Sequence, residues 1–347
     1  MNDTIQQARP SRPRAAIGFE LVAYALLAAY PLVAGGYGID LVTKIMVYAV
    51  LALSLELLVG STGLVCFGQA AFFGIGAYAA VLAAPQGDTP ALLVLLPLSL
   101  VAAGLYALAV GALSLRTQGV YFIMVTLAFA QMAYYIVHDT PLGGGTDGIY
   151  LYIKPVLEVG GSVWLDLDKP KVFYGFTLAC LIAVHVFLAV LLRSRFGRAL
   201  AGIKVNEQRM RATGYATYPY KLAAFGVSGA IAGLAGFLFG VKDGYVNPEL
   251  LSWHMSGAVL IMIILGGLGR LRGALIGAFA FALLQEFFKS EAIFGAHAKH
   301  WHLGLGLTII ASVALLPRGL VGVPAQIRER LDGRLSGARR VEGGAAS

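Results

Sequence analysis

Residues 194–222 read SRFGRALAGIKVNEQRMRATGYATYPYKL, a basic stretch that separates two long apolar runs in the middle of the chain. Asn206 is a good N-cap for a short helix, and Gly214 is a residue at which that helix can end. Met210 gives the helix an apolar face that we expect to dock into a groove of a partner, while Arg209 and Arg211 stay in water. We expect this charged loop to meet a partner in the cytoplasm, where membrane proteins retain their basic loops.

The composition of the chain is that of an integral membrane protein. Of its 347 residues, 58% are hydrophobic and 13% are charged, and the mean hydropathy is +0.77. A soluble domain carries about 25% charged residues, and a transmembrane helix needs about 20 mostly apolar residues. We therefore predict an all-α polytopic membrane protein with about ten transmembrane helices, at residues 15–36, 39–60, 65–84, 91–115, 119–138, 172–192, 222–241, 254–269, 273–288 and 302–317.

The distribution of arginine predicts how these helices are oriented. With ten spans and a cytoplasmic start, every arginine falls on one side of the membrane, which is the cytoplasmic side by the positive-inside rule. Both termini are then cytoplasmic. The net charge of +8 comes from inside loops and tails that face anionic lipid or a protein partner, so it requires no nucleic acid. The predicted parts are an N-terminal tail at 1–14, a transmembrane domain at 15–322 and a disordered tail at 323–347, with a long periplasmic loop at 139–171 and a cytoplasmic loop at 194–221.

Glycines at alternating spacings of three and four residues mark one helix for close packing. They fall on one face of the predicted helix, where small residues let a second backbone approach. We interpret this face as static packing rather than a sliding interface. The glycines are Gly226, Gly229, Gly233, Gly236 and Gly240.

The chain has none of the motifs that would let it supply energy or catalyse a reaction. It has no phosphate-binding loop of the form GxxxxGK[ST], and Gly267, Gly269 and Gly273 miss the dinucleotide spacing. We predict no bound cofactor or metal and no catalytic residues. An intramembrane enzyme or a secondary transporter is a remote alternative, because convergent catalytic groups and intramembrane charge relays are sparse.

Four polar residues within predicted spans are candidates for a substrate pathway. Glu56 is the strongest, because a carboxyl group at membrane depth must face protein or a cavity. A carboxyl group that only ties two helices together explains Glu56 equally well. Gln69, Thr126 and Gln131 are weaker candidates of the same kind.

Several stretches resemble the LivM-type permease subunits of branched-chain amino-acid ABC importers, and together they cover most of the membrane portion. They include GSTGLVCFGQAAFFGIGAYAA at 60–80, RTQGVYFIMVTLAFAQM at 116–132, GGTDG at 144–148, FGRALAGIKVNEQRMRATGY at 196–215, YKLAAFGVSGAIAGLAGFLFG at 220–240, GYVNPELLSWHMSG at 244–257, ILGGLGRLRGALIGA at 264–278 and LLPRGLVG at 315–322, and together they are highly specific.

This resemblance implies a multi-pass subunit of the bacterial inner membrane that forms half of a translocation pathway. Its implied partners are a homologous LivH-type permease, two cytoplasmic ATPases that use ATP and Mg²⁺, and a periplasmic substrate-binding protein. The loop at 194–221 matches the segment that couples the family's permeases to the ATPase, with Asn206, Glu207, Arg209, Met210, Arg211 and Gly214 as its candidate residues. Branched-chain amino acids are the implied substrate, and urea, short amides and aromatic acids are alternatives.

Overall fold

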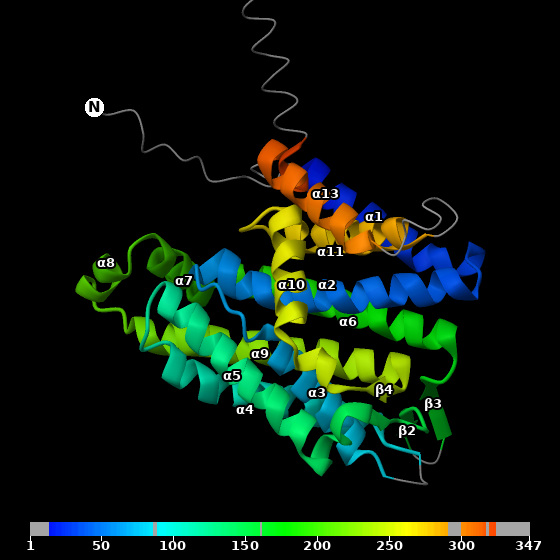
Figure 1. Ribbon diagram of the computed structural model, residues 1–347. Coiled ribbons are helices and arrows are strands. Elements are labelled where there is room, and N and C mark those ends of the chain that lie inside the picture. Colours follow the sequence, from blue (N-terminus) through cyan, green and yellow to red (C-terminus); the bar gives the residue numbers. More distant parts are fainter. Residues whose placement is uncertain (1–13, 86–88, 160–161, 291–299, 317–318, 324–347) are drawn as a thin grey trace, which may run out of the picture.

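The computed structural model describes residues 14–85, 89–159, 162–290, 300–316 and 319–323. Apart from Arg14 and Val323, the predicted tails at 1–14 and 323–347 lie outside the described residues. The long helices form one bundle (Figure 1). They are α1 (Arg14–Val33), α2 (Gly36–Thr62), α3 (Gln69–Ala83), α4 (Leu92–Ser114), α5 (Val120–Asp139), α6 (Pro170–Arg193), α9 (Thr217–Asp243), α10 (Trp253–Gly266), α11 (Leu271–Lys289) and α13 (Trp301–Leu315).

All ten apolar segments predicted from the sequence coincide with these helices, which confirms a helical, polytopic membrane protein. Seven stretches of the described chain are long and apolar enough to cross a membrane, namely α2, α4, α5, α6, α9, α11 and Trp301–Gly322. The apolar parts of α1, α3 and α10 are shorter, at 10–17 residues. Ten crossings therefore remain a prediction.

One predicted helix begins later than expected. The span predicted at 65–84 starts only at Gln69, because the residues after α2 form a non-helical segment. Gly63 ends α2 in the left-handed region, with φ 75°. The backbone N–H of Phe67 then donates to Thr126 Oγ1 over 3.3 Å, and that of Gly68 donates to Cys66 Sγ over 3.2 Å. These side-chain bonds replace the helical bonds that the segment lacks.

Helix α9 lies at the centre of the bundle and packs closely on α3 and α4. A Cβ atom built on Gly236 would lie 1.9 Å from the carbonyl oxygen of Phe73, and one on Gly229 would lie 2.1 Å from Ala107 Cβ. Real Cβ atoms do not approach that closely. The glycine face predicted from the spacing is confirmed as a site of close backbone approach.

Two small antiparallel sheets lie at one end of the bundle. Strand β1 (Ile149–Tyr150) pairs with β4 (Tyr245–Val246), and β2 (Val156–Val159) pairs with β3 (Ser162–Asp166). Short 3-10 turns accompany them at Pro141–Gly143, Gly145–Asp147 and Pro248–Leu251, and a further turn follows α13 at Leu320–Gly322. The short helices α7 (Arg195–Val205) and α8 (Glu207–Ala212) lie at the opposite end from β2 and β3 (Figure 1).

Candidate functional site

The charged loop between α6 and α9 folds as two short capped helices. The side chain of Ser194 caps α7 by accepting from the backbone N–H of Gly197, and Asn206 Oδ1 caps α8 by accepting from the N–H of Arg209 over 2.9 Å. Gly214 follows α8 with φ +87°, a conformation that other residues adopt poorly. The helix expected after Asn206 and its end at Gly214 are confirmed.

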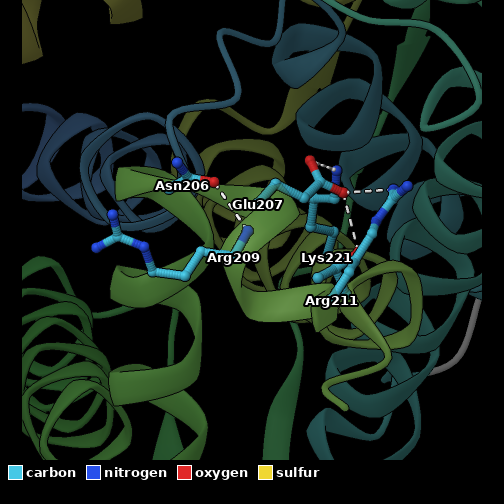
Figure 2. A network of polar contacts seen from close by, with 6 residues as sticks. Asn206, Glu207, Arg209, Arg211 and Lys221 are labelled. Atoms are coloured by element: carbon cyan, nitrogen blue, oxygen red, sulfur yellow. Dashed lines mark hydrogen bonds and ion pairs between the residues drawn. The ribbon is translucent and has the colours of Figure 1, made fainter. Parts of the chain in front are cut away.

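Glu207 is the centre of a polar network that fastens α8 to α9. Its Oε1 accepts from Arg211 over 2.7 Å and from the hydroxyl of Thr217 over 2.9 Å, and its Oε2 accepts from Lys221 over 2.8 Å (Figure 2). Only 8% of the Lys221 side chain is exposed. Burial of Glu207 opposes ionisation, but the hydrogen bonds from Lys221, Thr217 and Arg211 outweigh it and lower the pKa of the carboxyl group.

The remaining side chains of α8 point in two directions. Arg209 is exposed and points away from Glu207 (Figure 2), and its side chain has no bonded partner in the described chain. Met210 instead packs toward α7, with its sulfur 2.7 Å from the Cβ position of Gly202. Met210 therefore packs within this chain, contrary to the expectation that the apolar face of α8 docks into a partner, and the exposed side of α8 carries the free side chain of Arg209. A cavity of about 420 Å³ beside Met210 is lined also by Arg195, Arg198, Ala199 and Tyr215.

Glu56 lies where α2 meets the turns at the α7–α8 end of the bundle. The residue is only 2% exposed, in the second turn from the end of α2. The backbone N–H groups of Gly269 and Arg270 face its carboxylate, and so does the charge of Lys204. Lys204 Nζ also donates to the carbonyl oxygen of Gly60 over 2.7 Å. Glu56 therefore lies between α2, the turn from α10 to α11 and the end of α7, which are distant from one another in the sequence.

Gln69 lies in a buried polar cluster at the start of α3. Its Nε2 donates to the hydroxyls of Ser54 over 2.6 Å and Ser228 over 3.2 Å, and the Ser256 hydroxyl accepts from the backbone N–H of Ala70. The cluster joins α2, α3, α9 and α10. In the described chain, Gln69 Oε1 has no hydrogen-bond partner.

Thr126 and Gln131 both lie on α5 but in different surroundings. Thr126 is fully buried, and its hydroxyl accepts from Phe67 and donates to the carbonyl oxygen of Ile123 over 2.9 Å. Gln131 is half-buried, and its Nε2 is without a partner in the described chain. The structure thus brings Thr126 and Gln69 to the same non-helical segment. It links neither Glu56 nor Gln131 to them by a hydrogen bond among the described residues.

The sequence did not reveal the lysines and serines that bind the candidate residues. Lys221 lies 14 residues after its partner Glu207, and Lys204 reaches Gly60 across 144 residues. Only the pairing of Glu207 with Arg211, four residues apart on a helix, has a local signal in the sequence.

Comparison with known proteins identifies the family of this chain over most of its length. Residues 38–313, from α2 into α13, match the family described as the permease component of the branched-chain amino acid transport system. This chain belongs to that permease family. The permease is 30% identical over 325 residues to the high-affinity branched-chain amino acid transport system permease protein LivM of Escherichia coli, covering 87% of this chain and 74% of that protein.

Two further relatives are similar to the permease over different shares of its length. LivM of Salmonella typhimurium is 28% identical to the permease over 326 residues, with the same coverage of the two chains. The autoinducer 2 import system permease protein LsrC of Photorhabdus luminescens is 28% identical over 141 residues, or 39% of this chain and 41% of that one. No solved structure matches the permease. Family membership makes the chain the permease subunit of an ABC importer in the inner membrane.

Proposed function

We propose that this permease forms half of the translocation pathway for branched-chain amino acids delivered by a periplasmic binding protein. A homologous LivH-type permease forms the other half, and two cytoplasmic ATPases supply energy from ATP and Mg²⁺. The observation that carries the proposal is the match to LivM of Escherichia coli along 87% of this chain, since that protein is named for branched-chain amino acid transport.

The orientation that this function requires follows from the charges. We assign ten membrane crossings, with both tails, the segment 194–221 and the α10–α11 turn in the cytoplasm and the loop 139–171 in the periplasm. The arginine-rich helices α7 and α8 lie at the opposite end of the bundle from β2 and β3, which supports this assignment (Figure 1).

The segment from Asn206 to Gly214 is the proposed coupling segment. Arg209, the basic residue of α8 that lies outside the Glu207 network, would bind an acidic group of the ATPase. Glu207, Arg211 and Met210 hold α8 on α7 and α9, so a displacement of α8 is passed to the long helix α9. The anchoring residues and the contact residue thus have separate roles in this proposal.

The proposed substrate pathway passes the polar residues of α2, α3 and α5. Gln69 and Thr126 flank the non-helical segment before α3, where the backbone lacks helical hydrogen bonds and irregular structure inside a membrane needs protein or a cavity around it. Gln131 continues the pathway along α5. Glu56 lies at the end nearest the cytoplasmic turns.

Uptake by the complete reconstituted complex tests this function. The permease, its paired permease, the ATPases and the binding protein would be placed in lipid vesicles and offered labelled leucine, isoleucine, valine, urea, a short amide and an aromatic acid. We expect ATP-dependent uptake of the branched-chain amino acids and no uptake without the ATPases. Preferential uptake of urea, amides or aromatic acids would refute the proposed substrate, and ATP-independent uptake by the permease alone would refute the proposed class.

A further inference from the structure

The turn between α10 and α11 is exposed at its tip and closely packed at its base. Leu268 is 50% exposed, and Gly269 and Arg270 are exposed beside it. At the base, a Cβ atom on Gly266 would lie 1.8 Å from the carbonyl oxygen of Gly273. The exposed tip of the turn therefore projects from a base in which the two backbones are in direct contact.

The two arginines near this turn have different surroundings. Arg272 bonds to Glu20 of α1 and is three-quarters buried. Arg270 is exposed and its side chain has no bonded partner among the described residues, so its charge is available to another molecule. A cavity of about 290 Å³ adjoins Leu268 and Arg270 and is otherwise lined mainly by apolar side chains, among them Ile264, Leu265, Val313 and Leu316. The turn thus combines a free cation with an apolar recess.

Glu56 lies between this turn and the end of α2, and its Oε2 has no hydrogen-bond partner in the described chain. Its carboxylate faces the backbone N–H groups of Gly269 and Arg270. A Cβ atom on Gly60 would lie 2.0 Å from Glu56 Oε1, so glycine at this position leaves the room that the carboxylate occupies. On the other side, Lys204 at the end of α7 donates to the carbonyl oxygen of Gly60. Glu56 and Gly60 at the end of α2 thus face the turn and the end of α7, and α7 directly precedes the coupling segment.

We propose that residues 267–270 are a second contact surface for the cytoplasmic ATPase, with Glu56 as the positioning residue that aligns this turn with the coupling segment. The ATPase surface that fits it carries a carboxylate to pair with Arg270 and an apolar side chain to enter the adjoining recess. Because Glu56 faces the turn and Gly60 accepts from Lys204 of α7, a movement of the ATPase reaches α2 as well as α9. This inference rests on the function proposed above.

Photocrosslinking in the purified, assembled complex tests the contact. Benzoylphenylalanine would replace Leu268, with Arg209 in the coupling segment as the positive position and Tyr152, which is 89% exposed in the outer loop, as the negative position. We expect positions 268 and 209 to capture the ATPase and position 152 to capture none. Capture at 209 but not at 268, or capture of a second permease at 268, overturns this inference and leaves the proposed function intact. Capture at neither position overturns both.

The role of Glu56 is tested by two matched pairs of variants. Gly60→Ala places a methyl group where the Glu56 carboxylate lies, whereas Gly257→Ala on α10 has no neighbour within 4 Å. Glu56→Leu removes both carboxyl oxygens, whereas Glu56→Gln keeps one oxygen that can face the backbone N–H groups of the turn. Glu56→Leu and Gly60→Ala should lower capture at 268 relative to 209 about tenfold, equivalent to about 1.4 kcal/mol. Their two controls should keep the parent ratio.

The ratio of the two capture yields separates positioning from general stability. Loss of folding or of membrane abundance lowers capture at 268 and 209 together and leaves their ratio unchanged. The same variants should reduce the ATP hydrolysis stimulated by loaded binding protein. An unchanged 268-to-209 ratio in both Glu56→Leu and Gly60→Ala refutes the positioning role.

Discussion

Replacing Glu207 with glutamine should loosen α8 from α9, because it leaves the ammonium group of Lys221 without its carboxylate. The lysine side chain is 8% exposed and that of Glu207 is 24% exposed, so water can replace the lost interaction with the ammonium group only in part. A hydrogen bond to a charged group contributes about 1.5–3 kcal/mol. The pair with Arg211, which is 58% exposed, adds only about 0.3–0.5 kcal/mol. We expect a total loss of about 2–3 kcal/mol, or about a 30- to 150-fold increase in local opening.

Hydrogen–deuterium exchange of the permease in lipid nanodiscs measures this opening directly. Peptides that cover 207–217 should exchange faster in Glu207→Gln by the factor given above. Glu249→Gln is the matched control, because it makes the same chemical change at an exposed glutamate near the strands at the other end of the bundle. The double variant Glu207→Gln with Lys221→Met should recover much of the protection, since it no longer buries an unpaired ammonium group. A double variant that is less protected than Glu207→Gln alone refutes this explanation.

The pH dependence of the same exchange follows from the lowered pKa of Glu207. A carboxyl group with a lowered folded pKa stabilises the fold above its unfolded pKa of about 4.3, and that contribution is lost as the pH falls through the folded pKa. After correction for intrinsic exchange rates, the α8 peptides should keep constant protection between about pH 6 and 8 and lose it below about pH 4. Protection that changes steeply between pH 6 and 8 would show that another group controls this contact.

Three further predictions test the topology and the packing of the bundle. Tyr152 and Arg209 would each be replaced by a single cysteine in a cysteine-free background. In intact cells, an impermeant thiol reagent should label position 152 and leave position 209 unlabelled. The reverse pattern would show that the proposed topology is inverted. Gly236→Ala should lower stability by about 1–3 kcal/mol through overpacking, whereas Gly175→Ala, with nothing within 4 Å, should change thermal stability little. Gln69→Leu should lower thermal stability by about 1–3 kcal/mol because it removes the two hydrogen bonds that Gln69 donates to Ser54 and Ser228 in the buried cluster, and unchanged stability would argue against the polar cluster.

The long helices and the short helix after Asn206 were predictable because their signals are local. Apolar runs of about 20 residues identify membrane helices whatever surrounds them. The cap by Asn206 and the positive φ of Gly214 depend on residues within one helical turn. The glycine spacing in α9 likewise predicted a close contact, although it did not identify α3 and α4 as the partners.

The polar contacts at the candidate sites were not predictable, because their partners come from distant parts of the chain. From the sequence, the residues before α3 are predicted to belong to an apolar helix. They are not helical, because the backbone of Phe67 bonds to Thr126, which lies far away in the sequence. Glu56 reads as an isolated intramembrane acid, since neither Lys204 nor the turn at Gly269 is near it in the sequence. Sequence reasoning therefore located these residues without assigning their neighbours.

The pairing of β1 with β4 has a consequence for the biogenesis of the permease. Tyr150 and Tyr245 are partners in this two-stranded sheet, and their ring centroids lie 4.7 Å apart although about 95 residues separate them. A ribosome adds about 5–20 residues per second, so β1 waits about 5–20 s for its partner strand to be synthesised. During that interval α6 and α9 must insert, and β1 presents an open edge at the membrane surface. A nascent chain that stalls before residue 245 would be left with that edge unpaired, exposed to proteases and to other unfinished chains.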